Sequence, residues 1–393
     1  MAKTSYDKAG ILNILLGASF LGAGGGGAYN LGVTMLDMLE SEGHLLQLDT
    51  ISVGDAAPDE YAAMVAGLGA PSNVVMAKFE QDLPGAFAAL QEACRVDGKT
   101  LTYLYSGEMG GLNTMVPIML HIVSSSDPAS RTPILDVDAN GRAVPELNTC
   151  LVSARGTPPS PVGIQGHNLN NTGLECRYLA WTQKYSSESS DVIAKRAESI
   201  ARSLAIEFGQ VGFSTWAVPS PSLATNACPG YLSIAHGIGN ALQLGTPYSE
   251  EKLSQIAAQL GGKAKTLCVG TVKKFTRDVS AGFDVGSTTI EGDDGIIYNI
   301  DFQNENIVAY SAGTSVITVP ERITILDYTT CQPLTNVEED IHTGKRVAVI
   351  ISASHENWWA PDCNAYRCWN PILDRVNYSE AFIDYDGTSH ARA

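Results

Sequence analysis

The chain has 393 residues, of which 44% are hydrophobic and 17% are charged, a composition that excludes a disordered chain. It contains 25 Lys and Arg residues against 42 Asp and Glu residues, which gives a net charge of −17. Since this charge repels polyanions at long range, we expect neither nucleic acid nor an anionic membrane surface as a partner.

The first 150 residues alternate short apolar runs with helical patterns, which is typical of an α/β layer. Helices are predicted at residues 9–20, 29–42, 84–95 and 114–123, and strands at residues 45–53, 61–68, 101–106 and 133–137. Because the connections between these elements are short, we expect a mostly parallel sheet with right-handed crossovers.

This pattern breaks at residues 155–163, where three prolines and two glycines disfavour regular structure. We therefore expect an N-terminal α/β domain, residues 1–160, and a C-terminal α+β domain, residues 161–393, that is β-rich from residue 265. The predicted fold class is thus α/β plus β.

In the C-terminal domain, helices are predicted at residues 190–208 with Ser190 as cap, at residues 229–243, and after Ser249. Strands follow one another from residue 265 to residue 352, with turn signals at residues 293–295 and 304–306. These signals indicate hairpins in an antiparallel layer. The polar segment from Leu373 to the end is predicted to fray.

The N-terminal residues lack the pattern of a signal peptide, and the apolar run at residues 11–21 is about half of the ~20 residues that a membrane span needs. We therefore expect a cytoplasmic protein. The eight cysteines include no Cys-x-x-Cys pair, so reduced and mostly buried thiols are expected.

Five glycines within residues 22–27 allow the backbone to pass close to a ligand. Their amide groups would be free to bind an anion or oxyanion. The expected substrate-binding positions in this segment are Gly24, Gly25, Gly26 and Gly27. The alternative is a tight turn between two helices.

A second glycine-rich segment, residues 106–114, joins a predicted strand to a predicted helix. Ligands of open α/β sheets bind where strands end and helices begin. Glu108 could there act as a general base or accept a hydrogen bond from a substrate N–H group. Asn113 would cap the helix, and Gly110 and Gly111 would let a ligand approach. The alternative is a capping loop whose glutamate points to water.

A third segment carries acids at alternate positions of a strand end, so that Asp136 and Asp138 share one face. Such acids can bind Mg²⁺ or polarise water, and a divalent metal on this pair is the one cofactor we consider. Arg142 and Glu146 are four residues apart and would pair on a helix. The alternative is a structural network of Asp and Arg. Leu147 stands where an EF-hand loop needs Glu, which excludes that loop.

Cys228 precedes a predicted helix start, where the helix dipole would lower the pKa of the thiol and produce a nucleophile. The alternative is an ordinary buried cysteine. His167 and His236 each lie beside a glycine without a partner at metal-ligand spacing, and we interpret both as structural.

Four motifs, taken together and in order, resemble the S-methyl-thiohydantoin desulfurase family, which is associated with hydantoinase and oxoprolinase enzymes. The motifs are residues 21–27, Gly-Leu-Gly-Ala-Pro at 67–71, residues 108–113 and residues 136–146. The resemblance extends to about residue 160 and is looser beyond, through residues 323–327 and 344–347. After the glycines this chain has Ala28-Tyr29, where the family pattern would have Asp-Pro.

The resemblance implies a hydrolase of a small five-membered cyclic amide or thioimidate, such as an S-methyl-thiohydantoin or a hydantoin-like ring. Water would replace methanethiol at a C=N carbon and leave a hydantoin. We expect the ring to lie over the glycines, with its carbonyl oriented by Asn113 and by the amides of residues 110–111. Glu108 or Asp138 would activate water, directly or through the metal. Arg142 would stabilise negative charge or hold Glu146.

Two alternatives come from other classes of protein. One is a non-catalytic partner subunit of a hydantoinase- or oxoprolinase-type enzyme. The other is a nucleotide-dependent enzyme, because Gly22, Gly24 and Gly27 satisfy GxGxxG and Asp49 lies about 20 residues further on. That motif requires a preceding strand, whereas residues 9–20 predict a helix. In each case we expect a homo-oligomer. The site prediction requires residues 22–27, 106–114 and 136–146 to meet around one cavity.

Overall fold

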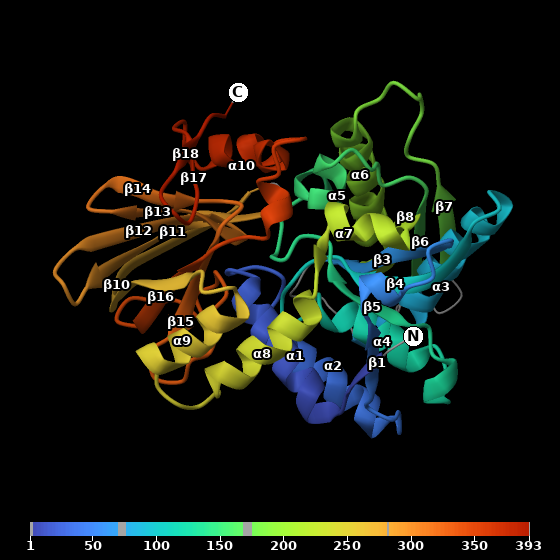
Figure 1. Ribbon diagram of the computed structural model, residues 1–393, viewed down its shortest axis with the longest axis horizontal. Coiled ribbons are helices and arrows are strands. Elements are labelled where there is room, and N and C mark those ends of the chain that lie inside the picture. Colours follow the sequence, from blue (N-terminus) through green and yellow to red (C-terminus); the bar gives the residue numbers. More distant parts are fainter. Residues whose placement is uncertain (1–2, 70–75, 168–174, 281–282, 393) are drawn as a thin grey trace.

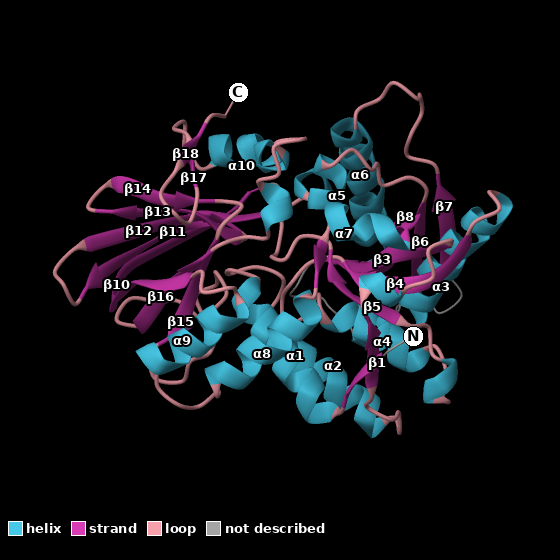
Figure 2. Ribbon diagram, in the orientation of Figure 1, coloured by secondary structure: helices cyan, strands magenta, loops and turns pink. Residues whose placement is uncertain are grey.

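The computed structural model describes residues 3–69, 76–167, 175–280 and 283–392. Two separate sheets lie side by side, with helices packed below and between them (Figure 1). The sheet nearer the N-terminus is covered by helices, and the other is formed by the C-terminal part of the chain (Figure 2). This arrangement confirms the α/β plus β fold class.

The first sheet is mixed. Its strand order is β1 (Lys3–Tyr6), β2 (Leu48–Ile51), β5 (Ile134–Asp138), β4 (Thr100–Ser106), β3 (Glu60–Gly69), β8 (Gln210–Pro219), β6 (Val162–His167) and β7 (Glu175–Ala180), with β9 (Cys228–Pro229) paired to β5. The four strands β2, β5, β4 and β3 are parallel, and the other pairings are antiparallel. The predicted parallel arrangement therefore describes the centre of the sheet, and three strands from beyond residue 160 extend it.

Helices cover both faces of this sheet. They are α2 (Tyr29–Ser41), α3 (Met76–Val96), α4 (Met115–Val123), α5 (Leu151–Ala154), α6 (Ser190–Phe208) and α7 (Leu223–Asn226). Helix α3 begins before Pro84, the residue predicted to open it, and tolerates this proline inside the helix. The cap of α6 is Ser189 rather than Ser190, because the Ser189 side chain accepts a hydrogen bond from the Val192 N–H group.

The second sheet is antiparallel throughout. Its order is β14 (Thr314–Thr318), β13 (Glu305–Ser311), β12 (Ile297–Gln303), β11 (Phe283–Gly292), β10 (Ala264–Ser280), β16 (Arg346–Ser352) and β15 (Arg322–Asp327). Both predicted hairpins are present, since β11 pairs with β12 and β12 with β13. The second of these turns places Glu305 at the start of β13.

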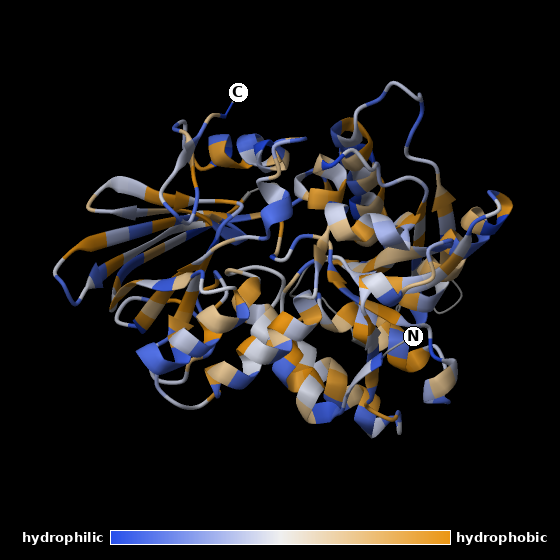
Figure 3. Cartoon of the chain, in the orientation of Figure 1, coloured by the Kyte–Doolittle hydropathy of each residue, from blue (hydrophilic) through white to orange (hydrophobic). Residues whose placement is uncertain are grey.

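Helices α1 (Lys8–Leu21) and α8 (Tyr231–Leu242) pack against each other beneath the two sheets, beside α9 (Glu250–Gln259). Both helices carry many hydrophobic residues (Figure 3), and those of the two helices belong to one buried cluster that includes Ile14, Leu15, Ala235 and Ile238. A Cβ atom on Gly17 would lie 1.8 Å from the Ala235 carbonyl oxygen, so only glycine permits this approach. Within the described ranges, no helix combines the length and the apolar character that a bilayer crossing needs.

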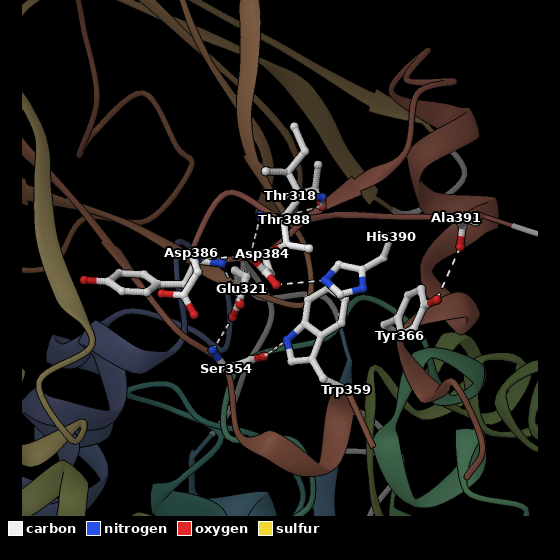
Figure 4. Close-up of polar contacts among 12 residues, drawn as sticks. Thr318, Glu321, Ser354, Trp359, Tyr366, Asp384, Asp386, Thr388, His390 and Ala391 are labelled. Carbon is white, nitrogen blue, oxygen red and sulfur yellow. Dashed lines mark hydrogen bonds and ion pairs between the residues drawn. The ribbon is translucent and has the colours of Figure 1, made fainter. Parts of the chain in front are cut away.

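The C-terminal segment does not fray. Its elements are α10 (Asn370–Arg375), β17 (Phe382–Ile383) and β18 (Ser389–His390). His390 lies 2.8 Å from the Asp384 carboxylate and stacks on Trp359, with 4.5 Å between ring centroids (Figure 4). The Tyr385 N–H group donates to Glu321. The prediction from polarity alone was wrong, because these polar side chains have partners within the fold.

Candidate functional site

The glycine loop, residues 22–27, lies against both other segments singled out in the sequence. The N–H groups of Gly111 and Asn113 donate to the carbonyls of Gly27 and Gly26, at 2.9 and 3.1 Å. In turn, the Met109 N–H group donates to the Arg142 carbonyl at 3.3 Å. Three stretches far apart in the sequence therefore meet in direct backbone contact.

Only glycine fits where two of these stretches cross. Gly26 has a φ of +71°, and a Cβ atom there would lie 2.1 Å from the Met109 carbonyl oxygen. Gly110 has a φ of +157°, and its Cβ atom would lie 2.2 Å from the Gly26 carbonyl oxygen. Both the backbone conformation and the available space thus exclude a side chain.

The second sheet holds the glycine loop from the other side. The Asn306 N–H group donates to the Ala23 carbonyl at 2.8 Å, and the Asn336 N–H group donates to the Gly24 carbonyl at 3.4 Å. The Glu305 side chain lies directly against Gly25. Both sheets therefore contribute to one site.

The glycine loop keeps donors available for a ligand. Over the described parts of the chain, the N–H groups of Gly24, Gly26 and Gly27 donate no hydrogen bond. Helix α2 follows at once, and its cap residue Ala28 supplies no side-chain acceptor. An Asp at this position would have capped α2, so the departure from the family pattern leaves this helix end uncapped.

Glu108 is held on both carboxylate oxygens. Oε1 accepts from the Asn113 side-chain amide, and Oε2 accepts from the Val144 N–H group at 2.8 Å. Burial, reinforced by repulsion from Asp138, raises the pKa of Glu108 to about 7, although both hydrogen bonds oppose this shift. A carboxyl group with a pKa near neutrality suits general acid–base chemistry. Asn113 positions Glu108 instead of capping α4, whose cap residue is Thr114.

The two aspartates of the third segment have separate structural partners. Asp138 is fully buried, and its Oδ1 atom accepts from the N–H groups of Asn140 and Gly141 at 2.9 and 2.6 Å. Burial raises the pKa of Asp138 to about 7. Asp136 instead caps α8, accepting from the Leu232 N–H group at 2.9 Å and the Ser233 hydroxyl at 2.5 Å. Backbone donors thus occupy oxygens on both carboxylates.

A metal on Asp136 and Asp138 stays a prediction. Within the described ranges, three potential ligand side chains have their ligand atoms within 4.8 Å of one another at Glu42, His44 and Glu80. That group lies between α2 and α3 and includes neither aspartate.

Arg142 is buried, and its Nη atoms donate to three backbone carbonyls in two other segments. Its Nη1 atom donates to Pro320 and Glu321 at 3.0 and 2.7 Å, and its Nη2 atom donates to Asn306 at 3.2 Å. Burial lowers the pKa of Arg142 to about 10, so it stays charged at neutral pH. The expected pair with Glu146 is wrong, because this stretch is not helical and Glu146 pairs with Arg375 at 2.5 Å.

Glu305 is an acid of this site that the sequence analysis missed. It is 2% exposed, and burial together with repulsion from Glu108 raises its pKa well above the usual range. The residues around Glu305 predicted only a hairpin turn. The available signal was an acid that follows a turn directly and opens an otherwise apolar strand.

Two pockets of the structure lie away from the glycine loop. A pocket of about 870 Å³ is lined by Tyr6, Ser233 and His236, and one of about 500 Å³ includes Asp136 and Gly230. At the glycine loop the three stretches are closely packed, and a ligand would approach over partly exposed residues. These are Gly25, Gly27, Glu108, Asn113 and Glu146.

Cys228 does not have the environment of a nucleophile. Its thiol is fully buried in β9, and burial, with repulsion from Asp138, raises its pKa well above the usual range. The dipole argument fails because the thiol is not exposed at the helix end. His167 contacts Asp82 at 2.8 Å, and His236 packs on Tyr6 with 5.0 Å between ring centroids.

The dinucleotide alternative lacks its structural context, because α1, a helix, leads into the glycine loop where the motif requires a strand. The Gly67–Pro71 motif is only partly visible. Its residues 67–69 end β3, and residues 70–71 lie outside the described residues.

Comparison with known proteins identifies the class. The S-Me-THD-like N-terminal domain matches residues 10–175, and the S-Me-THD-like C-terminal domain matches residues 192–368. The chain therefore belongs to the S-Me-THD-like family, as its motifs indicated. No curated protein matches its sequence. A crystal structure of a protein from Chromobacterium violaceum is similar, with a TM-score of 0.78 and 22% identity over 98% of this chain and 100% of that chain. This last likeness shows the shared fold.

Proposed function

We propose that this protein is a hydrolase of a small five-membered cyclic amide or thioimidate, with an S-methyl-thiohydantoin as the first substrate to test. The observation that carries the proposal is the Glu108 carboxylate, held by Asn113 and Val144 next to a glycine loop with free N–H groups. Membership of the S-Me-THD-like family supports this substrate class.

In this proposal Glu108 takes a proton from water, whose oxygen attacks the ring carbon that carries sulfur. The C–O bond forms, the C–S bond breaks, and methanethiol leaves a hydantoin carbonyl. In the net reaction one proton of the water ends on the ring nitrogen and the other on the sulfur of methanethiol. The free N–H group of Gly27, which is partly exposed, stabilises negative charge that develops on the ring. Arg142 acts from a distance, since its charge favours the ionised form of Glu108.

The test is release of thiol and hydantoin by the purified full chain incubated with an S-methyl-thiohydantoin. Glu108→Gln should lower kcat/KM by about 10²- to 10⁴-fold, the usual contribution of a general base. Glu92→Gln is the control, because Glu92 is an exposed acid of α3 that pairs with Arg95. Absence of hydantoin with the wild-type chain, or equal rates for the two variants, would contradict the proposal.

A substrate panel extends the test. Hydantoin itself and a five-membered lactam should be offered beside the S-methyl ring, with ring opening followed by mass spectrometry. Preference for the S-methyl ring is the expected result, because water then replaces a thiol without opening the ring. If only the unsubstituted rings are hydrolysed, the protein is still a hydrolase of five-membered rings, but a thioimidate is not its substrate.

A further inference from the structure

The Glu305 side chain lies against the glycine loop at Gly25. It is the first residue of β13, immediately after Asn304, whose φ of +54° closes the hairpin turn. A Cβ atom on Gly25 would lie 2.1 Å from Glu305 Oε1, while a Cβ atom on Gly26 would lie 2.1 Å from the Met109 carbonyl oxygen. The glycine loop therefore contacts both the Glu305 carboxyl group and the segment that carries Glu108, and the two carboxyl groups are close enough to repel each other.

The Glu305 carboxyl group is incompletely paired. Its Oε2 atom is buried and has no hydrogen-bond partner among the described residues. Arg142, whose charge favours the ionised form of Glu305, directs its Nη N–H groups to the carbonyls of Asn306, Pro320 and Glu321. The charges of Glu108 and Glu146 add repulsion.

A buried carboxylate without a hydrogen-bonding partner is costly, whereas a protonated carboxyl group avoids most of that cost. Two acids at one site are then in different states: Glu108 has hydrogen-bond donors on both oxygens, which favour its ionised form, and Glu305 does not. Such a division is how two carboxyl groups take the roles of base and acid at one pH.

We propose that Glu305 is the proton donor of this site and gives its proton to the sulfur of the leaving group, which makes it a second catalytic residue. The inference rests on the proposed function. Water loses a proton to Glu108 as its oxygen bonds to the ring carbon. The second proton of the water passes to the ring nitrogen as the C=N bond becomes C–N–H. The electron pair of the C–S bond goes to sulfur, the sulfur takes the Glu305 proton, and methanethiol departs from the hydantoin. Transfer of the proton on Glu108 back to Glu305 through solvent restores both groups, so the net reaction consumes one water.

This assignment narrows the substrate class. An alkylthiolate is a poor leaving group at neutral pH and needs a proton, whereas an arylthiolate with an electron-withdrawing ring leaves without one. The site is therefore suited to alkylthio rings. The role of Glu305 can therefore be tested by how strongly the rate of its variants depends on the leaving group.

The test compares an S-methyl-thiohydantoin with its S-(nitrophenyl) analogue. Glu305→Gln should lower kcat/KM on the S-methyl ring by about 10²- to 10⁴-fold and on the S-(nitrophenyl) ring by less than about tenfold. Glu108→Gln should lower both rates equally, because both rings need activated water. Glu305→Asp, which keeps a carboxyl group, should recover at least about tenfold of the S-methyl rate relative to Gln. Equal losses of Glu305→Gln on the two rings, or no recovery with Asp, would overturn the assignment.

A second measurement needs no turnover. Infrared difference spectra of the full chain at about pH 8, wild type minus Glu305→Gln, should contain the C=O band of a protonated carboxyl group. Wild type minus Glu92→Gln should lack it. If the wild type releases no thiol from either ring, the proposed function fails while this band still reports on Glu305. Absence of the band overturns the inference whatever the activity.

Discussion

The Val144 N–H group donates to Oε2 of Glu108 at 2.8 Å, and this bond joins the loop after β4 to the loop after β5. Oε1 of the same carboxyl group accepts from Asn113. Since both neighbours are donors, the position is built for a carboxylate. Burial nevertheless keeps the pKa of Glu108 at about 7, so its ionisation falls within the range where activity can be assayed.

The pH dependence of activity follows from this pKa. A general base must be ionised, so kcat/KM should rise as pH increases through about 7. It should fall again at alkaline pH as Glu305 loses its proton, because burial raises the pKa of Glu305 well above its usual range. The profile of kcat/KM from acid to alkaline pH checks both the rise and the fall. The two apparent pKa values of this profile belong to the interacting pair of acids rather than to either residue alone. A rate that declines steadily from acid pH would contradict the assignment of Glu108.

Asp138→Asn should reduce the dependence of stability on pH. The folded-state pKa of Asp138 is raised to about 7, above its unfolded value, so its stabilising effect is complete below the unfolded pKa and is lost as pH rises through about 7. An Asn mimics the protonated acid, because its oxygen can still accept from the N–H groups of Asn140 and Gly141. The slope between about pH 5 and 7 should lessen by up to roughly 1.4 kcal/mol per pH unit.

Urea denaturation at a series of pH values measures this slope. Asp293→Asn is the control, because Arg346 lowers the pKa of that surface acid and its titration lies below the window. An unchanged slope in Asp138→Asn would mean that Asp138 is ionised in the folded protein.

Gly25→Ala should destabilise the protein by overpacking. The new Cβ atom would lie 2.1 Å from Glu305 Oε1, and Gly25 does not have a left-handed φ, so the loss comes from this clash. A cost of about 1–3 kcal/mol is expected. Gly54→Ala is the matched control, since its nearest neighbour, Ser52 Oγ, lies 3.9 Å away. A double-mutant cycle with Glu305→Ala should show partial relief. If the stability losses of Gly25→Ala and Glu305→Ala are additive in the double mutant, the clash does not involve Glu305.

Arg142→Met should be the most damaging substitution of this set. It removes the donors for the carbonyls of Pro320, Glu321 and Asn306 and leaves buried acids without their cation. Removing one partner of a buried charged network costs about 3–5 kcal/mol. Arg95→Met, on the exposed surface of α3, should change stability by less than about 0.5 kcal/mol. Denaturant midpoints compare the two, and a loss below about 1 kcal/mol for Arg142→Met would refute its structural role.

Local patterns in the sequence predicted much of the fold. Apolar periodicity located α1, α6 and the parallel strands, and the turn residues located both hairpins of the second sheet. These features depend on neighbouring residues. The antiparallel extension of the first sheet by β6, β7 and β8 depends on long-range pairing, which no local pattern encodes. The ordered C-terminal segment escaped prediction for the same reason, because partners such as Glu321 and Trp359 are distant in sequence.

The candidate site divides in the same way. Motif spacing singled out the glycine loop, Glu108 and the acidic segment, and the structure brings these three stretches into contact. Chemical roles were harder to assign, because they depend on which donor each carboxylate meets. Asp136 shares a face of the predicted strand with Asp138, but its side chain caps α8. Arg142 donates hydrogen bonds to backbone carbonyls and does not pair with Glu146. Glu305, nearly 200 residues from Glu108, has no motif around it.

The hydrogen bonds from Asn306 and Asn336 to the carbonyls of Ala23 and Gly24 have a consequence for how a molecule enters. They join the glycine loop to β13 and to the connection between β15 and β16. Moving the two sheets apart would break these hydrogen bonds. Admission of a small ring is thus expected to rely on side-chain adjustments at the rim, and neither half expressed alone would retain a complete binding surface.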